Sequence, residues 1–319
     1  MTLLQVDRLT VDYPLHGKER LRAVNEVSLT LQAGRTLALV GESGCGKSSL
    51  GHAIAGLQKP THGRVVFQGQ ELTQLPARER RTLAAHLQLV FQDPAAALNP
   101  RMSIASSIAE PLVIHGVARQ ARERRVAELL ERVGLSSEVG RRSPHALSGG
   151  QRQRAVIARA LALSPRLLIC DEPVSALDTS IRAQILNLLI ELQDDLGLAY
   201  LFISHDMAVV RHIADDVAVM YAGRIVEQAP TDRLFSQPGH PYTQSLMASI
   251  LPPDPRHRMP PQPFTGEVPS RFTDPRGCAF SSRCPRSDVG CTVRTPELEG
   301  HAPVHRIACL LAEEGLSSP

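Results

Sequence analysis

A run of small residues around one lysine, GESGCGKS at residues 41–48, has the spacing of a phosphate-binding loop, G-x-x-x-x-G-K-S. The run follows the apolar stretch LALV and precedes SLGHAIAGL, so we expect a strand before it and a helix after it. Glycines let the backbone point its N–H groups at phosphate oxygens, and the helix N-terminus adds partial positive charge. Lys47 is expected to reach the β- and γ-phosphates, and the Ser48 hydroxyl to ligate Mg²⁺. The predicted nucleotide-binding residues here are Gly41, Glu42, Ser43, Gly44, Cys45, Gly46, Lys47, Ser48 and Ser49.

A second stretch, RLLICDEP at residues 166–173, ends an apolar strand-like run with two carboxylates. Asp171 is placed to hold the Mg²⁺ shell, and Glu172 to polarise an attacking water. An acidic pair alone is more often an ordinary turn or helix cap. Because a phosphate loop lies about 120 residues upstream, the two motifs together predict a nucleoside triphosphate hydrolase.

The stretch HALSGGQRQRAVIARAL, residues 145–161, lies between these motifs. Its LSGGQ resembles the signature of ATP-binding-cassette (ABC) ATPases, and further family elements follow the family order. Gln92 in LVFQDP resembles the Q-loop glutamine, SALD at residues 175–178 the D-loop, and His205 in ISHD the switch histidine. Tyr13 in VDYP resembles the aromatic residue that stacks on adenine, with plain packing as the alternative.

The resemblance covers about residues 1–235 and implies a mechanism. Gln92 would contact Mg²⁺ and the attacking water, Glu172 would be the base, and His205 would donate to the γ-phosphate. Two such subunits would pack head to tail, with each nucleotide between the phosphate loop of one and the signature of the other. The residues implied to contact the partner's nucleotide are Ser148, Gly149 and Gly150. Gln151 and, in the D-loop, Asp178 are also predicted to bind nucleotide.

Three stretches narrow the resemblance: FQDPAAALNPRMSI, CDEPVSALDTSIRAQILNLL and GHPYTQSLMASILP. They are similar to the ATP-binding subunits of bacterial dipeptide and oligopeptide importers. This resemblance implies a second ATPase subunit, which in this group is often a different one but can be identical, together with two transmembrane permeases and an extracytoplasmic substrate-binding protein. It also implies a peripheral position on the cytoplasmic face of the inner membrane. The cargo stays open among dipeptides, oligopeptides, glutathione, opines and nickel chelates.

The main alternative is a soluble ABC-type ATPase that acts on nucleic acid or ribosomes. Such chains tend to carry two cassettes or long coiled coils, whereas this sequence has one phosphate loop and no sustained heptads. The net charge is only +3 and aromatic residues make up 3%, which offers little for binding nucleic acid. We therefore expect no nucleic-acid partner. An exporter ATPase is disfavoured by the importer-like C-terminal stretch.

Four of the six cysteines lie near the C-terminus, with the spacing C-x5-C-x6-C-x17-C. A proline-rich segment with little core would gain stability from a metal. Disulfides are disfavoured in a reducing compartment, and zinc sites commonly use C-x2-C pairs, which are absent. All-thiolate ligation also suits an iron–sulfur cluster, and the tail resembles a 4Fe-4S segment of the peptide-importer group. We therefore predict a 4Fe-4S cluster, with Zn²⁺ as the alternative, on Cys278, Cys284, Cys291 and Cys309.

These residues need a scaffold, and strand-like runs that alternate with helix-like stretches predict an α/β fold with a largely parallel sheet. Within SIRAQILNLLIELQDDLG, apolar residues recur at helical spacing and Gly197 is placed to end the helix. The resemblance implies a P-loop ABC ATPase domain at 1–235, with a RecA-like core, an antiparallel β subdomain and a helical subdomain at about 94–165. Residues 236–319 are predicted to form a cysteine-containing extension. No apolar run approaches the ~20 residues that span a bilayer, and the N-terminus lacks a signal-peptide pattern.

Overall fold

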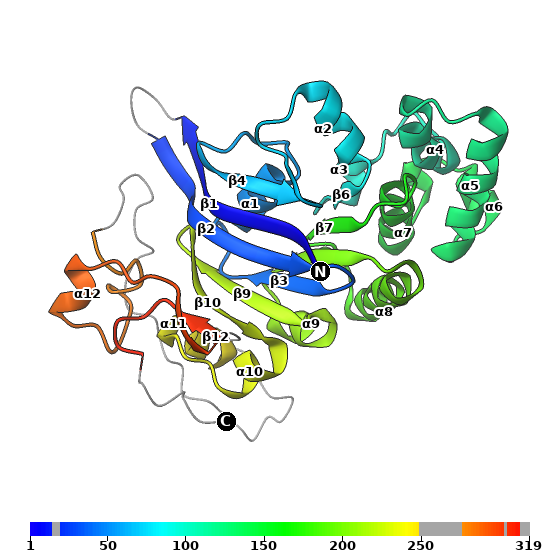
Figure 1. Ribbon diagram of the computed structural model, residues 1–319. Coiled ribbons are helices and arrows are strands. Elements are labelled where there is room, and N and C mark those ends of the chain that lie inside the picture. Colours follow the sequence, from blue (N-terminus) through cyan, green and yellow to red (C-terminus); the bar gives the residue numbers. More distant parts are fainter. Residues whose placement is uncertain (15–19, 249–275, 303–304, 313–319) are drawn as a thin grey trace, which may run out of the picture. The chain divides into compact units, whose positions relative to one another are not determined.

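The computed structural model describes residues 1–14, 20–248, 276–302 and 305–312 (Figure 1). The chain divides into two compact units that alternate along the sequence. The first unit consists of Met1, Gln32–Arg35 and Gln74–Ile203. The second consists of Thr2–Leu31, Thr36–Thr73 and Ser204–Pro319.

Parallel strands form the centre of the first unit. They are β6 (Leu87–Val90), β7 (Leu167–Asp171) and β8 (Ala199–Ser204). Leu87 is opposite Leu167, and Leu167 is opposite Ala199. Every residue of β7 and β8 is buried, which explains why both strands read as continuous apolar runs rather than as alternating ones. The predicted α/β class with parallel strands is confirmed for this part of the chain.

Helices make up most of the remainder of the first unit, and Figure 1 shows α4, α5, α6 and α7 grouped together. The helices are α2 (Ala77–Ala84), α3 (Pro94–Ala97), α4 (Ile104–Ile114), α5 (Arg119–Arg132), α6 (Ser137–Gly140), the 3-10 turn η1 (Pro144–Ala146), α7 (Gly149–Ala160) and α8 (Thr179–Leu196).

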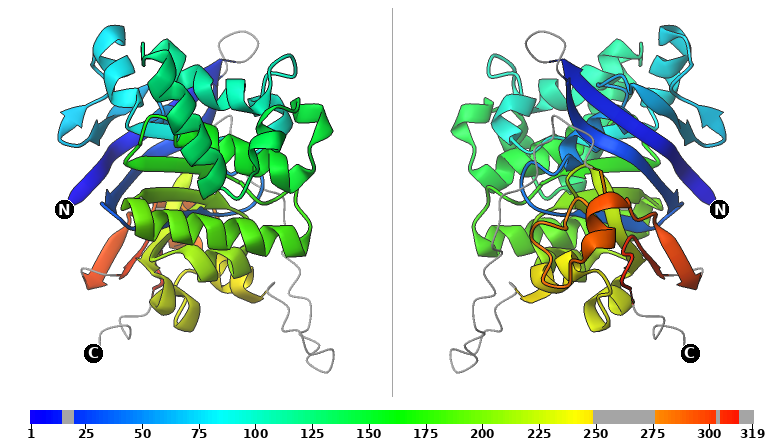
Figure 2. Two further views of the ribbon diagram at one scale, coloured as in Figure 1. Left: turned by 90° about the vertical axis from the view of Figure 1, so that its right-hand side faces the viewer. Right: turned by 90° about the vertical axis from the view of Figure 1, so that its left-hand side faces the viewer.

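The longest of these helices, α8, follows the predicted pattern (Figure 2). Its carboxylate cap Asp178 accepts a hydrogen bond from the N–H of Ile181. The apolar face that includes Ile185, Leu188, Leu189 and Leu192 is buried. Gly197 ends the helix with a φ of 64°, in the left-handed region that favours glycine. The predicted helix and its end at Gly197 are confirmed.

Two sheets build the second unit. An antiparallel sheet has the order β2-β1-β4-β5. A second set of strands has the order β11-β12-β10-β9-β3, in which β3 and β9 are parallel and the other pairs are antiparallel. The strands are β1 (Thr2–Pro14), β2 (Arg20–Gln32), β3 (Thr36–Val40), β4 (His62–Phe67), β5 (Gln70–Glu71), β9 (Asp216–Tyr221), β10 (Arg224–Pro230), β11 (Glu299–Ala302) and β12 (His305–Ile307).

The helices of the second unit are short. They are α1 (Lys47–Ile54), α9 (Met207–Ile213), α10 (Thr231–Ser236), α11 (Pro241–Ala248) and α12 (Val289–Val293). Among the described residues of the chain, no helix is both long and apolar enough to cross a bilayer.

Aromatic side chains join the C-terminal segment, which comprises the described residues beyond 236, to the sheet of the second unit. Tyr221 at the end of β9 lies 4.6 Å from Tyr242 and 5.2 Å from Phe280, measured between ring centroids. All three rings are at most 1% exposed. Tilted and edge-to-face pairs of this kind contribute about 0.5–1.5 kcal/mol each beyond their buried area. The C-terminal segment therefore shares one apolar core with β9.

A buried carboxylate fixes the same segment from another side. Glu227 in β10 is fully buried and accepts hydrogen bonds from the backbone N–H groups of Gly239 and His240, at 2.7 and 2.9 Å. Its Oε1 also lies 2.7 Å from Nε2 of His305 in β12. Three separate chain segments thus meet at one side chain.

His240 gives the second unit a pH dependence. Burial lowers the pKa of His240 to about 4 from an ordinary value near 6.5, although the nearby Glu227 charge opposes the shift. Since the unfolded chain binds this proton at higher pH, stability is full above pH 6.5 and falls as the pH drops towards 4. We expect protonation of His240 in the unfolded chain to lower the free energy of unfolding by about 2 kcal/mol between pH 7.5 and pH 5.

The variant His240→Asn tests this expectation. Asparagine can keep an acceptor for the N–H of Tyr242, which now donates to Nδ1 of His240 at 3.0 Å, but it does not titrate. Urea unfolding at pH 7.5 and pH 5 should show a smaller loss of stability for the variant than for the parent chain. Equal losses in both proteins would show that other groups cause the acid sensitivity.

Candidate active site

The phosphate loop joins β3 to α1, as the sequence predicts. Gly41, Gly44 and Gly46 have φ values of 156°, 77° and 109°. A Cβ at Gly46 would overlap the carbonyl oxygen of Ala23, and one at Gly41 would overlap that of Met220. Glycine is therefore required at both positions by close backbone packing as well as by conformation.

The Lys47 ammonium lies within the curl of this loop. Its Nζ donates to the carbonyl oxygens of Gly41 and Glu42, at 2.8 and 3.0 Å, and the residue is only 5% exposed. Cys45 is also buried, and its Sγ is 3.8 Å from Nζ. The loop thus holds one buried cation at the N-terminus of α1, where a helix dipole adds to the attraction for phosphate.

Tyr13 at the end of β1 lies beside the start of α1. Its hydroxyl donates to Oγ of Ser49 at 3.2 Å. This contact places an aromatic ring near the phosphate loop, although stacking on adenine stays a prediction.

His205 is exposed and precedes α9, where Asp206 caps the helix by accepting from the N–H of Ala208.

The carboxylate pair lies at the C-terminal end of β7 in the first unit. Asp171 is the last residue of the strand and is 4% exposed. Glu172 has a φ of 46°, a conformation that is strained for a residue with a side chain. The amide Nε2 of Gln92 donates to Oε2 of Glu172 at 3.1 Å. The structure therefore brings together two residues that are 80 positions apart in the sequence.

The signature begins helix α7. Oγ of Ser148 accepts from the N–H of Gln151 at 3.3 Å, and Oε1 of Gln151 accepts from the N–H of Ser148 at 3.2 Å, which forms a capping box. Ser148 and Gly149 are exposed, whereas Gly150 is buried. A Cβ at Gly150 would lie 2.6 Å from Cγ2 of Ile181, so glycine permits α7 to approach α8.

The predicted residues thus fall into two groups, each held within one unit. The second unit holds Tyr13, the phosphate loop and His205, and the first holds Gln92, Ser148–Gln151, Asp171, Glu172 and Asp178. Asp178 caps α8, and its contact with nucleotide stays a prediction.

Two residues that the sequence did not indicate also contact the phosphate loop. The hydroxyl of Tyr242 accepts from the N–H of Glu42 at 2.8 Å. Arg283 donates from Nη1 and Nη2 to the two carboxylate oxygens of Glu42, at 3.0 and 3.1 Å. Tyr242 lies in the stretch HPYTQ, for which the sequence predicted a family but no role in the nucleotide site. Arg283 lies between two of the cysteines for which a metal was predicted.

The prediction of a metal on the four C-terminal cysteines is wrong. Among the residues that the structure describes, which include all four, no group of three or more His, Cys, Asp or Glu side chains can hold a metal ion. All four are free thiols. Cys278 and Cys284 pack against the core around Tyr221, and burial raises the pKa of Cys278 to about 11. Cys278 and Cys284 therefore act as packing groups in this core.

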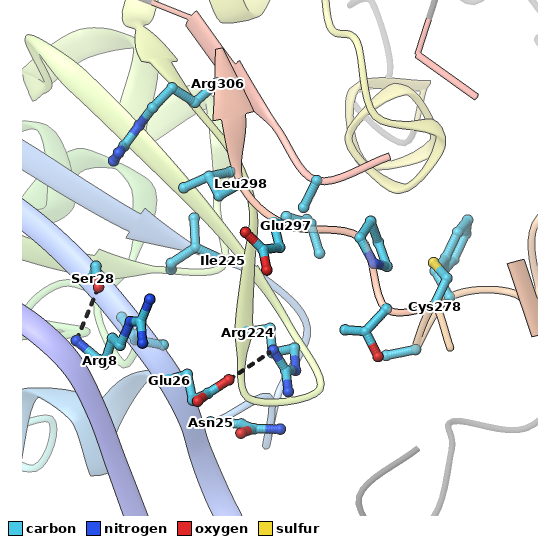
Figure 3. Close-up of a pocket in the computed structure, with 17 residues that line it drawn as sticks. Arg8, Asn25, Glu26, Ser28, Arg224, Ile225, Cys278, Glu297, Leu298 and Arg306 are labelled. Carbon is cyan, nitrogen blue, oxygen red and sulfur yellow. Dashed lines mark hydrogen bonds and ion pairs between the residues drawn. The ribbon is translucent and has the colours of Figure 1, made fainter. Parts of the chain in front are cut away.

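Cys278 also lines a cavity of about 540 Å³ in the second unit (Figure 3). The cavity lies between residues of β2, β10 and the C-terminal segment, and its walls carry both signs of charge. Glu26 and Arg224, whose side chains approach to 3.6 Å, line it together with Arg306. The cavity therefore gives Cys278 mixed polar and charged surroundings on one side.

Comparisons with known proteins match two parts of the chain to two family models. Residues 24–175 match the family model "ABC transporter", and residues 226–291 match "Oligopeptide/dipeptide transporter, C-terminal region". Among solved structures, the chain is similar to the ATP-binding cassette MJ0796, a dimer in a post-hydrolysis state with ADP and Pi. That match has a TM-score of 0.65 and 28% identity, and covers 72% of this chain and 99% of that one. The chain is also similar to cbiO1 of Clostridium perfringens, part of an ABC transporter complex, with a TM-score of 0.66, 29% identity and coverage of 74% and 91%.

Curated relatives match over nearly the full chain. The probable peptide ABC transporter ATP-binding protein y4tS of Sinorhizobium fredii is 48% identical, over 96% of this chain and 89% of the relative. The dipeptide transport protein DppF of Haemophilus influenzae is 46% identical, over 91% and 89%. The oligopeptide transport protein AppF of Bacillus subtilis is 47% identical, over 91% and 90%.

These relatives are named for ATP binding and peptide transport and not for an iron–sulfur cluster, which accords with the correction above. The cassette fold implies binding of ATP with Mg²⁺, and proteins of this kind are ATPases whose hydrolysis is coupled to transport. The chain belongs to the family of ATP-binding subunits of dipeptide and oligopeptide ABC transporters.

Proposed function

We propose that this chain binds and hydrolyses ATP to drive the import of peptides by a binding-protein-dependent ABC transporter. The observation that carries the peptide assignment is the match of residues 226–291 to the C-terminal region of oligopeptide and dipeptide transporters. The ATPase assignment rests on the phosphate loop and on the Gln92–Glu172 contact at the end of β7.

The phosphate loop fits a nucleotide because its glycines leave no room for side chains and its lysine is buried within the curl. Lys47 would exchange its two carbonyl partners for phosphate oxygens. Tyr13, whose hydroxyl is fixed by Ser49, would present its ring to adenine. These contacts would orient the γ-phosphate without any change in the fold of the loop.

Mg²⁺, when bound, would neutralise part of the phosphate charge, and the ligands that the family resemblance implies are Ser48, Asp171 and Gln92. Glu172 would take a proton from the attacking water, and the hydrogen bond from Gln92 Nε2 would hold its carboxylate in position. His205 would donate to the γ-phosphate. The backbone of Glu172 is strained, and such strain is common at active sites, where the surrounding structure holds a side chain in the position that the reaction requires.

A second, different ATPase subunit would complete the site. Ser148 and Gly149 are exposed at the N-terminus of α7, so their polar groups are available to a nucleotide held by a partner. Gly150, Gln151 and Asp178 would support that contact. Two membrane permeases would transmit closure of the ATPase dimer, and an extracytoplasmic binding protein would supply the peptide.

The proposed position is the cytoplasmic face of the inner membrane, on the permeases. We also propose that residues 1–235 form the ATPase domain, with a helical subdomain at about 94–165 that faces the permeases. Residues 236–319 would form an extension specific to this branch of the family, and most of the second family match, residues 226–291, falls within it.

Affinity purification from detergent-solubilised native membranes tests the proposal. We expect the tagged chain to recover two polytopic permeases and a second cassette ATPase, and the complex to show ATPase activity that rises with peptide-loaded binding protein. A matched purification from cells that lack the permease genes should recover the chain without these partners. Recovery with ribosomes or nucleic acid, and without permeases, would overturn the transport assignment.

A further inference from the structure

The C-terminal segment holds one residue of the phosphate loop at several points. Tyr242 accepts from the backbone N–H of Glu42, and Arg283 makes two parallel hydrogen bonds to the Glu42 carboxylate. The carbonyl oxygen of Glu42 accepts from Lys47 at 3.0 Å. Glu42 is therefore fixed through its N–H, its side chain and its carbonyl group at once.

The groups that hold Glu42 are themselves rigid. Tyr242 is fully buried in the aromatic cluster with Tyr221 and Phe280. The Arg283 side chain is 8% exposed, and its Nη1 also donates to the hydroxyl of Tyr221 at 3.3 Å. A bidentate arginine–carboxylate pair held in this way is stronger and more specific than an ordinary surface ion pair.

This arrangement has an electrostatic consequence for the loop. Glu42 places a negative charge on a loop whose ligand is a polyphosphate, and like charges repel. The guanidinium of Arg283 neutralises this negative charge locally. The side chain of Glu42 is only 31% exposed, so water screens the charge less than it would on an open surface. Because Lys47 bonds the carbonyl of the same residue, displacement of Glu42 would also move an acceptor that positions the lysine.

We propose that Arg283 and Tyr242 are positioning residues that hold the phosphate loop through Glu42, so that the C-terminal extension sets the affinity for ATP. The proposal rests on ATP binding at this loop. It gives the extension a role in the nucleotide site that its match to a transporter C-terminal region does not state.

Equilibrium binding of ATP to the full-length chain tests the proposal. We expect Arg283→Met to raise the Kd for ATP about tenfold, which corresponds to about 1.4 kcal/mol. The KM for ATP should rise more than kcat falls, because the chemistry at Glu172 is not directly changed. Arg286→Met is the matched control, since Arg286 lies in the same segment but is exposed, and its Kd should equal that of the parent.

A double-mutant cycle separates a contact through Glu42 from a general loss of structure. Once Glu42→Gln has removed the carboxylate, Arg283→Met should change the Kd by less than about twofold. Arg283→Lys, which keeps the charge but loses the bidentate geometry, should give an intermediate Kd and serves if the methionine variant fails to fold.

The outcomes distinguish this proposal from the proposed function. If the parent chain binds no ATP, the proposed function fails. If the parent binds ATP and Arg283→Met binds it equally well, or if the two substitutions are additive, Arg283 does not act through Glu42.

Discussion

Replacing Glu172 with glutamine is expected to lower ATP turnover by about 10²–10⁴-fold while ATP still binds. The amide oxygen of glutamine can accept the hydrogen bond that Gln92 now donates to Glu172, so the local geometry is kept and the basicity is lost. Glutamine has the same branching as glutamate, so the strain of the backbone at φ 46° should be the same in both proteins. The variant therefore tests the role of Glu172 as a base without moving its side chain.

Phosphate release at saturating ATP, together with the Kd for ATP, measures both parts of this expectation. Glu131→Gln is a suitable control, because Glu131 is an exposed glutamate at the end of α5 in the same unit. Its turnover should match that of the parent. Normal turnover of Glu172→Gln would show that another group, or water alone, accepts the proton.

Replacing Glu227 with alanine is expected to reduce the free energy of unfolding of the second unit by about 3–5 kcal/mol. The change leaves the N–H groups of Gly239 and His240 without their buried acceptor and leaves His305 without its carboxylate partner. Burial of donors without partners is costly because the water that satisfied them in the unfolded chain is not replaced.

Native-state hydrogen exchange of β10, β12 and the segment around residue 240 measures this loss where it occurs. Protection of these amides should fall in Glu227→Ala. Glu299→Ala, which removes an exposed carboxylate from β11, should change stability by no more than about 0.5 kcal/mol. Protection equal to that of the parent would mean that the carboxylate contributes little beyond its volume.

Local patterns in the sequence predict much of the nucleotide site. The phosphate loop with its flanking strand and helix, and the helix that ends at Gly197, depend on residues that are near each other along the chain. The contact between Gln92 and Glu172 joins two positions that the family resemblance had assigned to one site.

Contacts over long separations could not be predicted in this way. Arg283 and Glu42 are 241 positions apart, and nothing in either local sequence indicates the other. Glu227 stands in the strand RIVEQAP, where a glutamate is expected on a solvated face, yet it is fully buried because three backbone and side-chain donors converge on it. The spacing of the four cysteines wrongly predicted a metal, because spacing along the chain does not fix whether the thiols form a metal-binding group.

The pairing of β12 with β10 has a consequence for the behaviour of the protein in solution. A strand at the edge of a sheet exposes unpaired N–H and C=O groups that can recruit strands from other molecules. Strand β10 is largely buried, and β12 covers its side away from β9. Beyond β12, the outermost described strand at this edge is β11, which has four residues and begins with the exposed Glu299. Short, charged edges resist such recruitment, so the extension also guards the fold against aggregation.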